Sequence, residues 1–213
     1  MDIREMIDKI ELETGKHEGM EHGACIMELV SYLANETWSD NPKCACPILT
    51  KYAIGLNDSF NKEHRQLLKP AIPLLINSKS DDKTQIARKK LIMWRNVTAA
   101  FPLVLDGIKL PEFASALRLI KNTEEGMLSA LKILTDNKKI IKTNAYAYAD
   151  AAAYAAAYAN AYAYADADAY ATANAAADAY AYAYGFKKPT AEVLIETLIM
   201  AAKIKSHIDT LKS

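Results

Sequence analysis

Six side chains between residues 25 and 46 have types that could support chemistry. They are Cys25, Glu28, Ser39, Asp40, Cys44 and Cys46. The Cys44-X-Cys46 pair lies on a proline-flanked loop and offers two thiolates. Zinc prefers four thiolate or imidazole ligands in a tetrahedral arrangement. Cys25 and His22 would complete such a set, so a zinc site is one hypothesis for this region.

The same residues allow two other interpretations. A cysteine nucleophile needs a neighbouring base, and His22 is close to Cys25 in sequence. Buried free cysteines are, however, common as small apolar side chains, and Cys25 lies on an apolar helical stripe. In this structural interpretation Ser39 and Asp40 cap a turn, and Glu28 bonds loop N–H groups so that it joins two helices. We favour the structural interpretation over a metal site or a catalytic site.

The elements that would position these residues are predicted to be helices. Apolar side chains recur at helical spacing over residues 2–14 and 23–36, with a loop at 16–22 between them. A helix over 47–56 should be followed by a second one, capped by residues 57–59 and reaching 68. Pro70 and Pro73 should then break the chain near Lys69, because proline removes a helical hydrogen bond and clashes with the preceding turn.

The second half of the chain continues in the same way. A helix capped by residues 80–82 should run to about residue 99, and Pro102 and Pro111 should separate two short segments at 103–108 and 112–121. Another helix is expected over 122–134, and Pro189 should open the last one. No alternating run of β-branched residues occurs outside residues 145–183. We predict an all-α, multi-helix globular domain over 1–143, a tract over 144–185 and a C-terminal helix over 186–213 that packs back on the domain.

The tract is defined by its alternation, since every odd-numbered residue from 145 to 183 is alanine. Ten of the twelve tyrosines fall between residues 146 and 184. Alternation is typical of a strand, but ordinary strands run about 5–6 residues, and alanine is the best helix former. We therefore predict one very long helix, roughly 60 Å if straight, or a helix bent once near 172–174.

A helical projection separates the tract's side chains. Seven tyrosines fall on an arc from about 80° to 240°, whereas most Asp and Asn residues fall on the opposite side. Alanine allows close helix approach, and tyrosine adds a ring and a hydroxyl. The predicted surface for self-association or partner binding consists of Tyr148, Tyr154, Tyr158, Tyr162, Tyr170, Tyr180 and Tyr184.

Composition excludes several functional classes. Half of the 213 residues are apolar and the net charge is zero, so a disordered chain and a global bias toward nucleic acid or anionic membranes are not expected. One predicted helix carries a basic side without interleaved aromatic residues, which is typical of a solvated face rather than a nucleic-acid patch. That side consists of Lys83, Arg88, Lys89, Lys90 and Arg95.

Targeting signals are not expected either. The first residues lack the apolar core of a signal peptide, and no window has the roughly 18 strongly apolar residues of a membrane helix. The three cysteines are an odd number, so a disulfide framework is not indicated. We expect a cytoplasmic protein.

Two segments carry a family resemblance: Glu21-His22-Gly23-Ala24-Cys25-Ile26-Met27-Glu28 and Trp38-Ser39-Asp40-Asn41-Pro42-Lys43-Cys44-Ala45-Cys46-Pro47. They resemble an uncharacterised group of bacterial and phage proteins that share Gly-Ala-Cys-X-Met-Glu, then Ser-Asp-X-Pro-X-Cys-X-Cys/His-Pro, then a helix ending in Asn-Asp. Members also carry an Ala-rich tract before a terminal helix, although usually with Trp, Arg, Gly and Asp instead of Tyr. The resemblance implies a fold and a polar site, and it implies no activity.

Together these observations favour a non-enzymatic interaction or scaffold protein, with phage origin suggested by the resemblance. Its partner would be another protein or a second copy, not a membrane or nucleic acid. The alternative is a zinc-binding or thiol-dependent enzymatic module centred on Cys25, Cys44 and Cys46.

Overall fold

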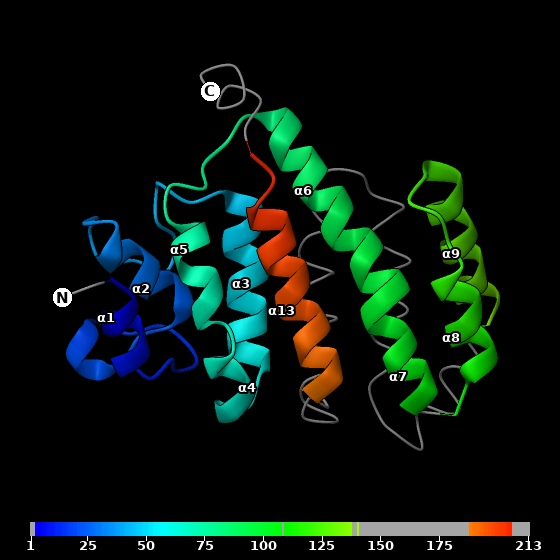
Figure 1. Cartoon of the computed structure of the whole chain (residues 1–213), viewed down its shortest axis with the longest axis horizontal. Helices are drawn as coiled ribbons and strands as arrows, with labels where there is room; N and C mark the ends of the chain where they lie inside the picture. Colours follow the sequence, from blue (N-terminus) through cyan, green and yellow to red (C-terminus); the bar gives the residue numbers. More distant parts are fainter. Residues whose placement is uncertain (1–2, 108, 138–139, 141–187, 206–213) are drawn as a thin grey trace. The chain divides into compact units, whose positions relative to one another are not determined.

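A computed structural model describes residues 3–107, 109–137, 140 and 188–205 of the chain. Within them every regular element is a helix, apart from one isolated parallel bridge between Leu12 and Ala24 (Figure 1). The prediction of an all-α protein is confirmed. The Ala/Tyr tract, including its possible bend and its seven-tyrosine surface, lies outside the described residues.

The chain divides into two compact units. The described residues of unit 1 are 3–92 and 195–205, and those of unit 2 are 93–107, 109–137, 140 and 188–194. The boundary after Ile92 falls inside a helix, where the sequence has no linker signal. The boundaries predicted at 143 and 185 fall outside the described residues.

Unit 1 is built from short helices with buried apolar faces. These are α1 (Ile3–Lys9), η1 (Met20–His22), α2 (Ile26–Leu33), α3 (Pro47–Ser59), α4 (Lys62–Gln66), η2 (Lys69–Ala71) and α5 (Ile72–Leu75). The first part of α6 (Asp82–Arg95) and the second half of α13 (Lys188–Ala202) complete it. The helix α2 contacts α3 and α5. The chain breaks near Lys69 as its two prolines predict.

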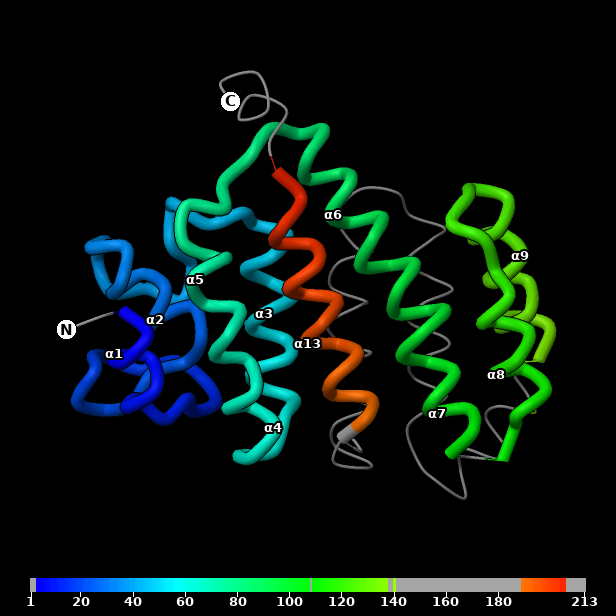
Figure 2. Tube along the Cα trace, viewed as in Figure 1, coloured from blue at the N-terminus to red at the C-terminus, as the bar shows by residue number. Residues whose placement is uncertain are grey.

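The C-terminal helix packs back on the fold as predicted. In unit 1 it lies along α3 and α6, which Figure 2 shows as neighbouring tubes. Leu198 and Ala201 are fully buried, and Leu194 is 4% exposed. The three residues recur at helical spacing and so form the buried face of α13.

One helix start differs from the prediction. Residues 57–59 do not cap α4; they form the last turn of α3, and α4 begins after Asn61, whose side chain accepts a hydrogen bond from the His64 N–H at 2.8 Å. Asn57 is instead fully buried. The prediction was wrong here because the Asn57 amide has distant partners, described below.

The prediction that Pro102 interrupts the helix is also wrong. In the structure α6, the π-helical turn η3 (Asn96–Ala100) and α7 (Phe101–Gly107) follow one another as a single 26-residue helix. Pro102 has no N–H to donate to the Thr98 carbonyl. The Phe101 N–H donates five residues back, to the Asn96 carbonyl. This wider π-helical turn accommodates Pro102, so the helix continues through it.

Unit 2 continues with α8 (Pro111–Arg118) and α9 (Glu124–Asp136). The helix α7 contacts α8, and α8 contacts α9. Leu105, Leu117 and Leu134 are among the side chains that they bury. Pro111 is at the first position of α8, where its missing N–H costs nothing. No helix in the described part of the chain is long and apolar enough to span a membrane.

Candidate functional site

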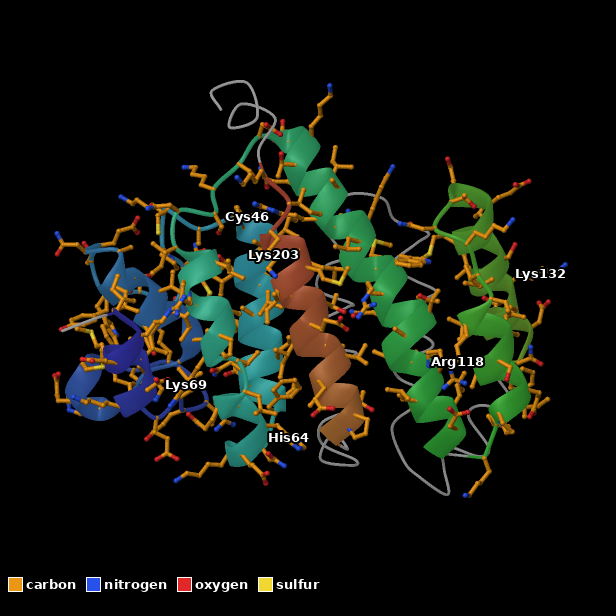
Figure 3. All side chains as sticks on the ribbon, in the orientation of Figure 1. Cys46, His64, Lys69, Arg118, Lys132 and Lys203 are labelled. Atoms are coloured by element: carbon orange, nitrogen blue, oxygen red, sulfur yellow. The ribbon has the colours of Figure 1, made fainter. Side chains whose placement is uncertain are left out.

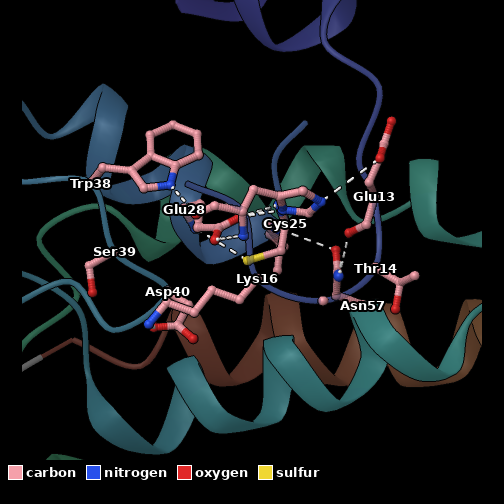
Figure 4. Close-up of polar contacts among 12 residues, drawn as sticks. Glu13, Thr14, Lys16, Cys25, Glu28, Trp38, Ser39, Asp40 and Asn57 are labelled. Atoms are coloured by element: carbon pink, nitrogen blue, oxygen red, sulfur yellow. Dashed lines mark hydrogen bonds and ion pairs between the residues drawn. The ribbon is translucent and has the colours of Figure 1, made fainter. Parts of the chain in front are cut away.

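Glu28 is the centre of the polar cluster around α2. Its side chain is completely buried, yet both carboxylate oxygens are used. Oε1 accepts the His17 backbone N–H at 2.7 Å, and Oε2 accepts the Cys25 backbone N–H at 2.8 Å. His17 Nδ1 also lies 2.8 Å from Oε2. The prediction that Glu28 bonds loop N–H groups is confirmed (Figure 4).

These hydrogen bonds keep the buried carboxylate ionised. Burial by itself raises the pKa of Glu28, but the two backbone N–H groups and the His17 ring outweigh it, so this pKa lies below its usual value. An ionised carboxylate can only accept hydrogen bonds. His17 must therefore donate from Nδ1, and its Nε2 faces Glu13 Oε2 at 3.8 Å.

Cys25 is the N-cap of α2. Its sulfur accepts the Glu28 N–H at 3.4 Å while Glu28 accepts the Cys25 N–H, a capping box with cysteine in the place usually taken by Ser or Thr. The thiol is 2% exposed. Burial raises the pKa of Cys25 to about 12, with the Glu28 carboxylate adding to the rise. At neutral pH the group is therefore a thiol, whereas a cysteine nucleophile attacks as the thiolate.

The glycine and alanine before Cys25 fit the same cluster. Gly23 has φ +104°, a left-handed conformation that favours glycine. A Cβ there would lie 2.9 Å from Glu13 Oε2 and 3.1 Å from His17 Cδ2. Ala24 is fully buried, and its carbonyl accepts the Glu13 N–H at 2.9 Å. The Gly-Ala-Cys-X-Met-Glu pattern thus describes a tightly packed helix start.

Two further elements hold the loop that contains His17. The Trp38 indole N–H donates to the His17 carbonyl at 2.9 Å. At the end of α3, the Asn57 side chain accepts the Ile26 N–H at 3.1 Å and donates to the Glu13 carbonyl at 2.8 Å. Asp58 accepts the Gly15 N–H at 3.0 Å. Together with Glu28 of α2, Trp38 and the end of α3 therefore hold residues 13–17 from three separate segments.

A buried arginine of α4, Arg65, supports this arrangement at the C-terminal end of α3. Arg65 donates to the Asn57 and Phe60 carbonyls, both at 2.6 Å, and so closes the C-terminal end of α3. Burial lowers the pKa of Arg65, while Asp58 and Glu13 act in the opposite direction. Arg65 thus holds the backbone carbonyl of Asn57, while the side-chain amide of Asn57 holds the loop.

Ser39 and Asp40 have separate roles at the turn after α2. Ser39 Oγ accepts the Asn41 N–H at 3.0 Å, so its predicted role as a turn cap is confirmed. The Ser39 N–H donates to Ser31 Oγ, which in turn donates to the Glu28 carbonyl at 2.8 Å. Asp40 lies 3.9 Å from the exposed Lys16 ammonium. Figure 4 shows both residues beside the cluster and not within it.

Cys44 and Cys46 belong to another contact, between the loop before α3 and residues 77–79. The Cys44 carbonyl accepts the Lys79 N–H at 2.8 Å, and the Cys46 N–H donates to Ser78 Oγ at 3.0 Å. Cys46 is fully buried as the N-cap of α3. Burial raises the pKa of Cys44, and the neighbouring Glu36 carboxylate adds to this. Both cysteines are free thiols.

The predicted zinc ligands are not gathered at one point. Across the described ranges, no three His, Cys, Asp or Glu side chains are grouped so that they could hold a metal ion. His22 is on the exposed turn η1, 3.5 Å from Glu21. The histidine that joins Cys25 and Glu28 is His17, because η1 carries His22 away and the loop folds back on α2.

The predicted basic side of α6 needs one correction. Arg88 is 3% exposed and is not part of a solvated face, because its guanidinium is directed into hydrogen bonds within unit 1. Lys83 and Lys90 are exposed as expected. The seven predicted tyrosines of the tract lie outside the described residues.

Sequence reasoning missed Glu13, Asn57 and Ser31 as members of the cluster. Asn57 has a detectable signal, since Ala53 and Phe60 lie on the same helical face, but its place before Asp58 and Ser59 favours a cap. Ser31 had a similar signal inside the apolar stripe of α2. Glu13 had none, because its contribution is mainly a backbone carbonyl.

Comparisons of this chain with protein-family models, with curated proteins and with solved structures gave no match.

Proposed function

We propose that this chain is a non-enzymatic interaction or scaffold protein, in which a folded helical body presents the Ala/Tyr tract to a second copy or to a partner protein. The observation that carries the proposal is the sequence of the tract. Twenty alanines at alternate positions place small residues along its whole length, and ten tyrosines lie between them. Small residues permit close helix approach, and tyrosine is enriched at interfaces because it combines a large ring with a hydroxyl.

The polar cluster supports a non-enzymatic role. The Glu28 carboxylate accepts hydrogen bonds from two backbone N–H groups and one imidazole, and Cys25 caps a helix with a thiol whose pKa is about 12. These groups hydrogen-bond one another and the backbone of residues 17, 25 and 28. The zinc-binding or thiol-enzyme alternative has no comparable support.

The resemblance to the bacterial and phage group stays a proposal that rests on the same residues. Three of the shared motif positions have an internal role here: Gly23 leaves space for two side chains, Cys25 caps α2, and Asn57 joins α2 to the loop. Internal roles of this kind would account for the presence of these residues in the group without implying an activity. We also propose a cytoplasmic location, because Cys25, Cys44 and Cys46 are free thiols.

Size-exclusion chromatography with light scattering tests the proposed self-association. The monomer mass is 23.5 kDa, and we expect the wild-type chain to exceed it. Tyr154, Tyr158 and Tyr162 lie on the predicted binding arc, so replacing all three with alanine should return the mass toward the monomer. The matched control replaces Tyr146, Tyr164 and Tyr182, which fall together on the opposite side of the projection, and it should keep the wild-type mass.

A wild-type chain that stays at the monomer mass over a wide concentration range would contradict self-association. Equal behaviour of the two triple variants would contradict the assigned face. The partner-protein form is tested by crosslinking in the source cell, where only the variant on the binding arc should lose its crosslinked species. Retention of all crosslinked species by that variant would contradict the proposal as a whole.

A further inference from the structure

Arg88 is a buried cation that joins three separate parts of unit 1. Its side chain is 3% exposed, and it extends from α6. Nη1 donates to the Ser78 carbonyl at 2.6 Å and to Ser80 Oγ at 3.0 Å, and Nη2 donates to the Ile204 carbonyl at 2.7 Å. Ile204 is 116 residues further along the chain. The guanidinium therefore connects α6, the loop before it and the end of α13.

The contact lies where two helix ends meet. Cys46 marks the N-terminal end of α3 and Lys203 the C-terminal end of α13, as labelled in Figure 3. Ser78 contacts both sides, since its hydroxyl accepts the Cys46 N–H while its carbonyl accepts Arg88. Ile204 lies two residues past the end of α13, so its carbonyl has no place in the helical hydrogen-bond pattern. The C-terminal end of a helix carries partial negative charge, and a cation beside it is favourable. Arg88 therefore supplies a donor to the Ile204 carbonyl and a positive charge near the helix end.

The three acceptors of Arg88 in the described part of the chain are neutral oxygens, and within that part its Nε has no hydrogen-bond partner. Burying a guanidinium is costly unless its N–H groups are paired, so the docked arrangement depends on these hydrogen bonds. Residues 195–205 also return to unit 1 only after the whole of unit 2. A segment that joins unit 1 only at the end of the chain can separate from it while the helices within residues 3–92 stay folded.

We propose that Arg88 is a clasp that docks the end of α13 on unit 1, and that residues 195–205 leave unit 1 as one segment when the clasp opens. The helix α13 begins at Lys188, shortly after the Ala/Tyr tract in sequence, and its second half belongs to unit 1. The clasp therefore sets whether the second half of the helix that follows the tract is held on unit 1, and its bearing on the tract rests on the proposed function. The docking itself does not.

Hydrogen–deuterium exchange of the full chain, read by mass spectrometry, tests the clasp. In Arg88→Gln we expect the amides of residues 195–205 to exchange on the order of ten- to a hundredfold faster, the ratio that matches the loss of a charged hydrogen bond. Exchange in α2 and in residues 11–25 should stay at the wild-type rate. Arg65→Gln is the matched control, since it removes another buried guanidinium from a helix end and should affect α3 and the 13–17 loop while leaving 195–205 unchanged.

Arg88→Lys keeps the charge but has one nitrogen and cannot reproduce the forked contact to Ser78 and Ile204. It should accelerate the same segment by a smaller factor, and it serves if Arg88→Gln does not fold. Unchanged exchange of 195–205, or an increase spread equally over α2 and α3, would overturn the clasp. Neither result depends on molar mass, so failure of the clasp and failure of self-association are distinguishable.

Discussion

Unit 1 and unit 2 satisfy their polar groups in different ways. In unit 1, side chains reach backbone groups far away in sequence: Gln66 pairs with both backbone groups of Leu12 across 54 residues, and Asn57 reaches Ile26 across 31. Between the residues of unit 2 that the structure describes, most of the side-chain bonds given are local, as when the Thr98 hydroxyl donates to the Trp94 carbonyl four residues earlier. The described bond with the greatest sequence separation there joins the Trp94 indole N–H to the Ile120 carbonyl, 26 residues away, at 3.4 Å.

The difference follows from how much irregular backbone each unit contains. Helices satisfy their own interior N–H and C=O groups, so unit 2, whose described residues are mostly helical, needs partners only at the helix ends. Unit 1 buries part of the segment 11–25, which is largely outside helices, and its backbone groups must find partners elsewhere. Glu28, Asn57 and Gln66 supply them. The polar residues that resemble a chemical site are therefore required by the loop.

The largest expected effect is on unit 1, from Glu28→Ala. This change leaves two buried N–H groups and an imidazole without an acceptor, and it should lower the free energy of unfolding by about 3–5 kcal/mol. Urea denaturation followed by Trp38 fluorescence, in a Trp94→Phe background, would measure it. Glu13→Ala is the control, because that side chain is 56% exposed and its loss should cost less than about 1 kcal/mol. Similar losses in the two variants would contradict a special role for Glu28.

Unit 2 should instead be most sensitive to backbone packing at Gly126. A Cβ built there lies 2.1 Å from the Lys121 carbonyl oxygen, which is backbone and cannot rotate away. We expect Gly126→Ala to cost about 1–3 kcal/mol, read from Trp94 fluorescence in a Trp38→Phe background. Gly107→Ala is the matched change in the same unit, with nothing within 4 Å of the new Cβ, and it should be neutral or slightly stabilising. A neutral Gly126→Ala would show that the turn adjusts freely.

Acid should distinguish the units as well. The pKa of Glu28 is lower in the folded chain than its ordinary value of 4.5, so the ionised carboxylate stabilises the fold. This contribution is fully present above pH 4.5 and is lost as pH falls through the folded-state pKa. We expect the free energy of unfolding of unit 1 to decrease below pH 4.5 in the wild type, and to decrease less steeply in Glu28→Gln. Denaturation series from pH 6 to pH 3 would measure both slopes, and identical slopes would assign the acid sensitivity to other groups.

The sequence predicts much of the fold and only part of the site. Helical spacing located α2, α6 and α9, and the two prolines correctly marked the break near Lys69, because these signals act within a few residues. Pro102 misled for the same reason, since its local penalty is removed by a π turn that adjoining residues form. Glu28 and Ser39 were correctly given structural roles from their positions beside a loop.

What could not be predicted depends on contacts across the fold. Asn57 has the same local signal whether it caps a following helix or holds a loop 44 residues away. His17 and His22 are both polar loop residues, and only the path of η1 decides which one meets Glu28. From the sequence, Arg88 is one more member of a basic helix side, and only its contact with Ile204, after α13, shows that it is buried.

The central claim is that Cys25 acts as a helix cap, and a comparison of Cys25→Ser with Cys25→Ala tests it most directly. Serine is a strong N-cap whose oxygen can accept the Glu28 N–H, whereas alanine has no acceptor and should cost about 1 kcal/mol. The account predicts that urea denaturation of the full chain gives a free energy of unfolding for Cys25→Ser close to the wild type and above that of Cys25→Ala. A serine variant less stable than the alanine variant would contradict the account, because it would show that Cys25 contributes as a buried apolar group.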